Sequence, residues 1–202
     1  MNDAVVFVAL VVGAYLFGSL SPSVFLGRLV KGVDVREHGS GNAGTTNAFR
    51  VLGKPLGVMV LIGDLLKGFL PALLATHVAG PVTVVFVAIA AIIGHNWSVF
   101  LRGKGGKGVA TAAGTILAMM PLIVAALTAT FLVVLAATST VSLGSLTAAL
   151  LFPILTVATG RPLPYMVFSV VASAVVIYAH RSNIKRLLQR REARVRLPWV
   201  SR

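Results

Sequence analysis

Long apolar runs, each followed by a short polar segment, limit what this chain can fold into. About 20 helical residues cross the hydrocarbon core of a bilayer, and several of the runs approach or exceed that length. The composition agrees, because 57% of the residues are hydrophobic and only 11% are charged, whereas about 25% is usual in soluble domains. The sequence therefore predicts an all-α integral membrane protein. The runs cover residues 4–26, 56–76, 82–101, 109–137, 146–158 and 165–179.

The distribution of positive charge predicts the orientation in the membrane. The net charge of +13 comes from Lys and Arg clustered between the runs and in a basic tail, residues 181–202. This pattern is typical of membrane topology rather than of nucleic-acid binding. By the positive-inside rule the tail and segment 102–108 both face the cytoplasm, so an even number of crossings separates them and run 109–137 must break near Pro121. We therefore expect one domain over residues 1–202, a bundle of seven transmembrane helices, several of them short, with the N-terminus outside and the C-terminus cytoplasmic.

The polar segments that are predicted to face the cytoplasm are where function is expected. The N-terminus, Met1-Asn2-Asp3, lacks the basic region of a signal peptide, so the first run should remain as a span. The chain contains no cysteine, which excludes disulfides and thiolate metal sites. The outer connections are short and leave no room for a separate soluble domain. The cytoplasmic segments are residues 28–54, 102–108, 139–145 and 180 onward.

Two glycine-rich segments adjoin the apolar runs and have the composition of an anion site. Both match the spacing G-x-G-x-x-G, but their neighbours are membrane spans, and no Walker A lysine is present, so neither indicates a nucleotide-binding fold. Small residues let backbone N–H groups converge on an oxyanion, and a helix that begins at Val109 would add its N-terminal dipole. A flexible basic loop is the alternative for the second segment. The segments are Gly39-Ser40-Gly41-Asn42-Ala43-Gly44-Thr45-Thr46-Asn47 and Gly103-Lys104-Gly105-Gly106-Lys107-Gly108.

The first glycine-rich segment also carries five hydrogen-bonding side chains within eight positions. A turn or a helix cap, which is the alternative reading, needs only one such side chain. Arg50 lies one helical turn beyond the segment, and its planar fork suits bidentate binding of a phosphate. We therefore predict that a polar, phosphorylated substrate binds here and at Lys104 and Lys107. The five side chains are those of Ser40, Asn42, Thr45, Thr46 and Asn47.

Ionisable residues inside or at the end of the runs are further candidates. Asp64 and Lys67 lie three residues apart on one helical face of the second run, where an ion pair that stabilises the bundle and a functional role both remain open. His180 ends the last run and can be structural or catalytic, with Asn183 on the same face if the helix continues. His95 is another candidate. No histidine or carboxylate stands three or four residues from these histidines, so no metal is expected.

Ser142 and Ser145 lie in the short inner segment before the fifth run. As helix caps they would satisfy backbone N–H groups, and as substrate-binding groups they would bond to hydroxyl or phosphate oxygens. Both readings stay open.

The order of these motifs along the chain is distinctive. Together they resemble the bacterial acyl-phosphate-dependent glycerol-3-phosphate acyltransferase family, PlsY, over nearly the whole chain. Small departures are Ala43, where proline or valine is frequent, and Thr45, where alanine is; residues 197–202 have no counterpart. The motifs are residues 39–47 followed by Arg50, Asp64-Leu65-Leu66-Lys67-Gly68, Gly94-His95-Asn96-Trp97-Ser98-Val99-Phe100 running into residues 104–111, Ser142-Leu143-Gly144-Ser145, and His180 with Asn183-Ile184 and Arg186-Leu187.

The resemblance implies a seven-helix enzyme of the bacterial inner membrane with its active site toward the cytoplasm. It would transfer a fatty acyl group from acyl phosphate to the 1-hydroxyl of sn-glycerol 3-phosphate, giving lysophosphatidic acid and inorganic phosphate in the first acylation of phospholipid synthesis. No cofactor is implied, and the partners are the two substrates and membrane lipid. Catalytic roles would fall on Lys104, Ser142, His180 and Asn183. Substrate or phosphate binding would fall on Ser40, Gly41, Asn42, Thr46, Asn47, Arg50, Gly103, Lys104, Gly105, Gly106, Lys107, Gly108 and Ser145.

The residues also limit the mechanism. Acyltransferases that use acyl-CoA carry an aspartate five residues after a histidine, and here no histidine has one. An acyl phosphate is already activated, so positioning and charge stabilisation can suffice. We expect His180 or the substrate's own phosphate to accept the hydroxyl proton, and Asn183 with backbone N–H groups to stabilise the carbonyl oxygen. An anion transporter and another lipid phosphotransferase are the competing readings.

Overall fold

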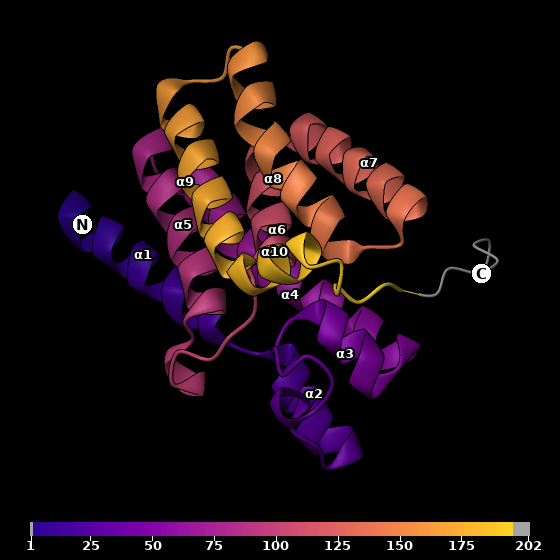
Figure 1. The fold of residues 1–202 in the computed structure, drawn as a ribbon. Coiled ribbons are helices and arrows are strands. Elements are labelled where there is room, and N and C mark those ends of the chain that lie inside the picture. The colour runs from indigo at the N-terminus through magenta and orange to yellow at the C-terminus, as the bar shows by residue number, and fades with distance from the viewer. Residues whose placement is uncertain (1, 196–202) are drawn as a thin grey trace. The chain divides into compact units, whose positions relative to one another are not determined.

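The computed structural model describes residues 2–195 of the chain, and all regular elements in this range are helices (Figure 1). The chain divides into two compact units, Met1–Met120 and Pro121–Arg202. A single domain over residues 1–202 stays a prediction. The end of the predicted basic tail, residues 196–202, lies outside the described residues.

The first unit is built around the helix pairs α4 with α6 and α1 with α5 (Figure 1). Glycines let these helices approach at backbone distance: a Cβ atom on Gly68 of α4 would meet the Thr111 carbonyl, and one on Gly18 of α1 would meet Ala91 of α5. Small residues at such contacts are typical of helix packing in membranes. The elements are α1 (Asp3–Ser19), α2 (Pro22–Lys31), η1 (Val35–Glu37), α3 (Thr45–Leu52), α4 (Lys54–Val78), α5 (Pro81–Asn96), η2 (Val99–Leu101) and α6 (Val109–Met119).

The second unit packs α8 between α7 and α9. Phe152 of α8 meets Phe168 of α9 edge to face, with ring centroids 5.8 Å apart, and the Ser173 hydroxyl donates a hydrogen bond to the Ala149 carbonyl at 2.6 Å. The helices are α7 (Pro121–Thr138), α8 (Val141–Ala158), α9 (Leu163–Ala179) and α10 (Arg181–Leu188).

The helices confirm the membrane character of the chain and part of the predicted topology. Among residues 2–195, five segments are long and apolar enough to cross a bilayer: Asp3–Lys31, Lys54–Val78, Pro81–Leu101, Pro121–Thr138 and Val141–Ala158. A sixth results if α9 and α10, which are bent by 61°, form one span, and α6 is a shorter apolar helix. The predicted break near Pro121 is present, because α6 ends at Met119 and α7 begins at Pro121. The count of seven and the orientation of the termini stay predictions.

Three local expectations need correction. The first apolar run lies within one candidate span, Asp3–Lys31, but it is not one continuous helix, because Ser21 precedes Pro22 and has extended dihedral angles, as residues before proline prefer. Ser142 and Ser145 lie inside α8 rather than in a loop, since only Ser139 and Thr140 separate α7 from α8. The last run does not continue straight from His180 to Asn183, because the chain bends between α9 and α10.

Candidate active site

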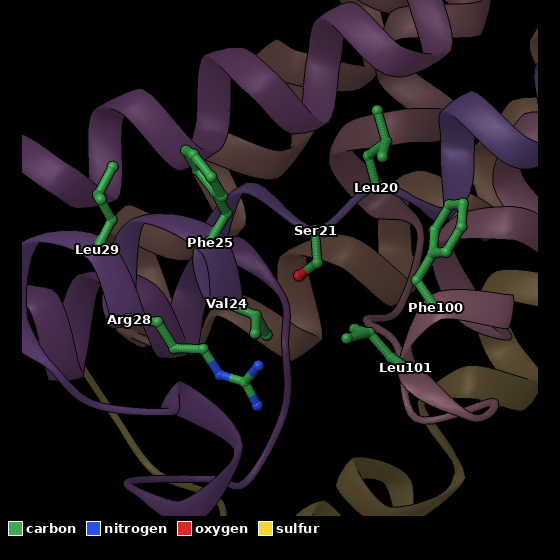
Figure 2. A pocket seen from close by; sticks show the side chains of 8 residues that line it. All are labelled: Leu20, Ser21, Val24, Phe25, Arg28, Leu29, Phe100 and Leu101. Carbon is green, nitrogen blue, oxygen red and sulfur yellow. The ribbon is translucent and has the colours of Figure 1, made fainter.

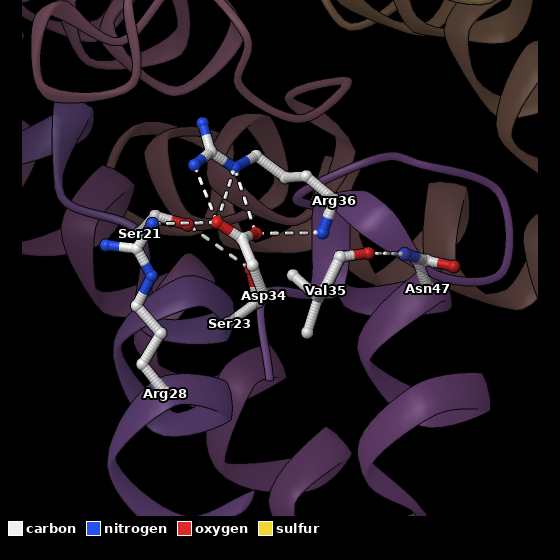
Figure 3. Close-up of polar contacts among 7 residues, drawn as sticks. All are labelled: Ser21, Ser23, Arg28, Asp34, Val35, Arg36 and Asn47. Atoms are coloured by element: carbon white, nitrogen blue, oxygen red, sulfur yellow. Dashed lines mark hydrogen bonds and ion pairs between the residues drawn. The ribbon is translucent and has the colours of Figure 1, made fainter. Parts of the chain in front are cut away.

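The segment between α2 and α3 is held in shape by one buried amide and one ion cluster (Figure 3). The side chain of Asn47, at the start of α3, accepts a hydrogen bond from the Ser40 N–H at 2.8 Å and donates to the carbonyls of Val35 at 2.7 Å and His38 at 3.1 Å. Only 2% of Asn47 is exposed. Asn47 therefore shapes the segment, and contact with a substrate stays a prediction for this residue.

The ion cluster is centred on Asp34 (Figure 3). Its carboxylate pairs with Arg36 at 2.7 Å and Arg28 at 2.9 Å and accepts the backbone N–H of Arg36 at 3.0 Å, which caps η1. The hydrogen bond from the Arg36 side chain, aided by Arg28, lowers the pKa of Asp34 far below its usual range in spite of partial burial. Sequence reasoning missed this cluster, although an aspartate between two arginines was the available signal.

The two glycine-rich segments lie against each other, although about sixty residues separate them. The Asn42 side chain donates to the Gly105 carbonyl at 3.4 Å and accepts the Gly44 N–H at 2.9 Å. A Cβ atom on Gly44 would lie 3.8 Å from the Cα atom of Gly106. The structure thus brings the first segment and the second segment together within one unit.

The backbone of the second glycine-rich segment is engaged with the end of α5 and with η2. The N–H groups of Gly105 and Gly106 donate to the carbonyls of Asn96 at 3.2 Å and His95 at 2.9 Å. The N–H groups of Gly103 and Lys104 donate to the carbonyls of Ser98 at 2.9 Å and Leu101 at 3.1 Å, respectively. These four groups hold the loop and do not converge on an oxyanion. An anion here would be bound by side chains and by the first N–H groups of α6, whose N-cap is Gly108 with φ of 78°.

Two cations of the predicted site are available for a ligand. Arg50, on α3, and Lys104, in the second glycine-rich segment, are both exposed. Neither belongs to any of the ion pairs formed among residues 2–195. Thr46 and Lys107 are half-buried, and Ser40 and Gly41 are exposed. Exposed cations without a carboxylate partner are what recruitment of a phosphorylated substrate requires.

Asp64 and Lys67 form the ion pair that their spacing predicted. The Lys67 ammonium lies 3.1 Å from Asp64 Oδ1, and the two side chains are 5% and 2% exposed. Lys67 also donates to the Leu20 carbonyl at 2.7 Å, where the chain breaks between α1 and α2. The other oxygen of Asp64 accepts the Thr45 hydroxyl at 2.8 Å. The pair therefore ties α4 both to the end of α1 and to the first residue of α3.

His95 completes this buried network. Its Nδ1 atom lies 3.5 Å from Asp64 Oδ1. The ring packs directly under Gly106, where a Cβ atom would overlap it. His95 therefore supports the second glycine-rich segment from below. Two further buried polar residues were not singled out from the sequence: Asn96, next to His95, and Thr111, on α6, which are 5% and 0% exposed. A polar residue within an apolar run was the available signal.

In the second unit the structure fixes the protonation pattern of His180. Its Nδ1 atom lies 2.8 Å from the Val176 carbonyl. A carbonyl only accepts, so Nδ1 carries the hydrogen and the lone pair of the neutral ring is on Nε2. The residue is 3% exposed and occupies the bend between α9 and α10. This arrangement suits a base that acts through Nε2.

Ser142 and Asn183 are joined by a residue that sequence reasoning did not single out, Glu192. Its Oε1 accepts the Ser142 hydroxyl at 2.8 Å and the Asn183 amide at 2.5 Å, and its Oε2 accepts Arg186 Nε at 2.7 Å. Burial alone would raise the pKa of Glu192, but the hydrogen bonds from Asn183, Arg186 and Ser142 lower it overall. Ser145 instead donates to the Val141 carbonyl of its own helix at 3.0 Å.

An open groove of about 440 Å³ lies at the break between α1 and α2 (Figure 2). Its walls are mainly apolar, and Arg28 contributes a cation. Such walls fit an alkyl chain. No three His, Asp or Glu side chains among residues 2–195 form a group suited to a metal ion. The groove residues are Leu20, Ser21, Val24, Phe25, Arg28, Leu29, Phe100 and Leu101.

Comparison with known proteins decides the family. The family model described as glycerol-3-phosphate acyltransferase matches residues 8–190. This chain belongs to the glycerol-3-phosphate acyltransferase family. It is 48% identical over 180 residues to glycerol-3-phosphate acyltransferase 2 of Moorella thermoacetica, covering 89% of this chain and 92% of that one. It is 43% identical over 187 residues to the enzyme of Syntrophomonas wolfei, covering 93% and 96%.

Solved structures of the family agree with this assignment. PlsY (YgiH), an integral membrane glycerol 3-phosphate acyltransferase, has been solved in a glycerol 3-phosphate form. It superposes with a TM-score of 0.91 at 41% identity, covering 94% of this chain and 96% of that one. Its lysophosphatidic acid form gives a TM-score of 0.89 at 40% identity, covering 94% and 95%. The chain described here is thus an acyltransferase of the PlsY family, embedded in a membrane and serving phospholipid synthesis.

Proposed function

We propose that this protein transfers a fatty acyl group from acyl phosphate to the 1-hydroxyl of sn-glycerol 3-phosphate. The hydroxyl oxygen forms the new ester bond to the acyl carbon, and the bond from that carbon to the phosphate oxygen breaks. The products are lysophosphatidic acid and inorganic phosphate, and the hydroxyl proton passes to a base or to the departing phosphate. The contact between the two glycine-rich segments, with Arg50 and Lys104 exposed beside them, is the observation that carries this proposal.

Electrostatic stabilisation is the main catalytic contribution that these residues can make. Both substrates are phosphorylated, and the charge on the phosphate leaving group grows as its bond to carbon breaks. Cations placed at that charge act without a strong acid. Arg50 and Lys104 are therefore assigned to the phosphates, together with the first N–H groups of α6. The role of Gly103 to Gly106 in phosphate binding is to give the loop its shape, because their N–H groups are bonded within the protein.

Proton transfer is assigned to His180. With Nδ1 bonded to Val176, Nε2 of the neutral ring is the atom that accepts the hydroxyl proton. The substrate's own phosphate is the alternative acceptor. A loss of activity in His180→Gln with an unchanged pH profile would favour the phosphate, whereas loss of the profile's acidic limb would favour His180.

The acyl chain is assigned to the apolar groove at the break between α1 and α2. Leu20→Trp, which adds bulk at an exposed wall of the groove, should shift the preference toward shorter acyl phosphates. An unchanged chain-length profile would place the acyl chain elsewhere.

Purified protein in detergent provides the test of the reaction. We expect acyl phosphate and glycerol 3-phosphate to yield inorganic phosphate and lysophosphatidic acid, while acyl-CoA yields little. Accumulation of anion in vesicles without phosphate release would indicate a transporter. Movement of a phosphoryl group, with no acyl ester formed, would indicate a lipid phosphotransferase.

We further propose seven spans in the bacterial inner membrane, with the N-terminus outside and the site facing the cytoplasm. The absence of cysteine allows single-cysteine variants to be labelled without background. Cysteines at Arg50 and Lys104 should react with an impermeant reagent only from the cytoplasmic side. Labelling of either position from outside would overturn the orientation.

A further inference from the structure

The chain after α10 turns back toward the start of α8. The Arg191 N–H donates to the Arg186 carbonyl at 2.8 Å, and the Val195 N–H donates to the Ser139 carbonyl at 2.8 Å. Glu192 lies between these two attachments. This segment was expected only to carry the positive charge of a cytoplasmic tail, and the one acid in it is directed inward.

Hydrogen-bond direction at Glu192 is fixed by chemistry. An ionised carboxylate only accepts, so Ser142, Asn183 and Arg186 must all donate to it. A serine hydroxyl has a single hydrogen. While Ser142 donates to Glu192, it can offer a substrate only its oxygen lone pairs.

We propose that Glu192 is a positioning residue for acyl transfer, which orients the Ser142 hydroxyl and the Asn183 amide for the acceptor substrate. Ser142 then accepts a hydrogen bond from a hydroxyl of the glycerol moiety and does not donate to a phosphate oxygen. One N–H of Asn183 points at Glu192, which sets the plane of that amide. This inference rests on the proposed function, because it presupposes glycerol 3-phosphate as the acceptor.

An opposite role would be a blocking one, in which the Glu192 carboxylate occupies groups meant for the substrate. The structure favours positioning. The Glu192 side chain is only 9% exposed and has three donors, and the backbone beyond it is bonded to Ser139. A blocking strap must leave at each turnover, which would leave the buried side chains of Ser142 and Asn183 without the acceptor that they share and would break the ion pair with Arg186.

Two substitutions separate these roles. Glu192→Gln keeps the size of the side chain but replaces one carboxylate oxygen by an NH2 group, so at least one of the three donors then faces an N–H and not an acceptor. Glu192→Ala removes both acceptor oxygens. We expect Glu192→Gln to lower kcat/KM for glycerol 3-phosphate by about tenfold or more at an unchanged unfolding temperature. Arg194→Gln is the matched control, because Arg194 is an exposed charge two residues away; its kinetics should match the unsubstituted protein.

A double-substitution cycle tests whether Glu192 acts through Ser142. In a Ser142→Ala background, Glu192→Gln should cost less than about threefold, since the group that it orients is gone. Fully additive losses, kinetics equal to those of Arg194→Gln, or a rise in activity on removing Glu192 would each overturn the proposal. If Glu192→Ala does not fold, the similarly sized Glu192→Gln still gives the result. An unsubstituted protein inactive with acyl phosphate would overturn the proposed function and this role with it, whereas an active one with normal Glu192 variants overturns only the role.

Discussion

The buried pair Asp64 and Lys67 offers the sharpest test of how structure and function are linked in this enzyme. Asp64→Leu leaves the Lys67 ammonium, 5% exposed, without its counter-charge at 3.1 Å. Removing one partner of a buried pair costs about 3–5 kcal/mol. For a chain of this size each kcal/mol shifts the unfolding temperature by about 2–4 °C. The single variant should therefore unfold at least about 6 °C lower.

The double variant Asp64→Leu with Lys67→Met separates stability from catalysis. It buries no unpaired charge, and replacing a buried pair by apolar residues is often neutral within about 1 kcal/mol or stabilising. Its unfolding temperature should return close to the original. Its activity should not return, because His95, whose ring packs under the second glycine-rich segment, has lost the Asp64 carboxylate at 3.5 Å, and the Leu20 carbonyl has lost its Lys67 donor at 2.7 Å.

The assays are thermal unfolding in detergent and lysophosphatidic acid formation on the same preparations. We expect the double variant to keep less than about a tenth of kcat/KM. Thr45→Val, which leaves the ion pair and its contact with His95 intact, should keep most of the activity at normal stability. Full activity in the double variant would refute a functional role for the pair and leave it as an ion pair that only stabilises the bundle. An unshifted unfolding temperature in Asp64→Leu would refute the energetic reasoning.

Three further predictions concern the remaining parts of the first unit. Lys104→Ala and Arg50→Ala should each reduce kcat/KM by about tenfold or more, equivalent to about 1.4 kcal/mol; near-normal kinetics in both would remove these cations from the site. Gly106→Ala should lower activity and stability because a Cβ atom would overlap the His95 ring, whereas Gly80→Ala, which has open space, should not; equal effects would contradict the packing. Because the pKa of Asp34 is lowered in the folded state, its contribution to stability is full above the ordinary value of about 3.9 and is lost as the pH falls toward the folded value. The stability difference from Asp34→Asn, measured by denaturant unfolding, should be constant from pH 5 to 8 and shrink below about pH 4; a difference that grows on acidification would refute the assignment.

Apolar patterning predicted the helices well, because a helix that contacts lipid needs a long run of apolar residues, and such a run is visible in the sequence. The break at Pro121 followed from counting crossings, and the start of α6 at Val109 followed from the glycines before it. The spacing of Asp64 and Lys67 correctly indicated one helical face. The last two inferences depend only on neighbours along the chain, and the break at Pro121 depends on the distribution of charge along it.

Contacts set by tertiary structure could not be predicted in the same way. The amide-rich segment predicts a set of ligand-binding groups, yet Asn47 bonds to its own loop and Thr45 to Asp64. Composition predicts that the N–H groups of Gly103 to Gly106 form an anion cradle, but two of them bond to the end of α5 and two to Ser98 and Leu101 at η2. Glu192 appeared as a lone acid in a basic tail. In each case composition correctly predicts a polar segment, but the hydrogen-bond partner depends on how the chain folds and not on the local sequence pattern.

The close contacts made by glycine in the first unit limit how this enzyme can move. With Gly68 of α4 against the backbone of Thr111, and Gly114 of α6 against that of Leu65, neither helix can slide or roll past the other without collision. We therefore expect α4 and α6 to move as one body during turnover. Motions that admit a water-soluble phosphate ester and release a lysophospholipid are then expected outside this helix seam, and variants with altered turnover should be sought in other parts of the chain.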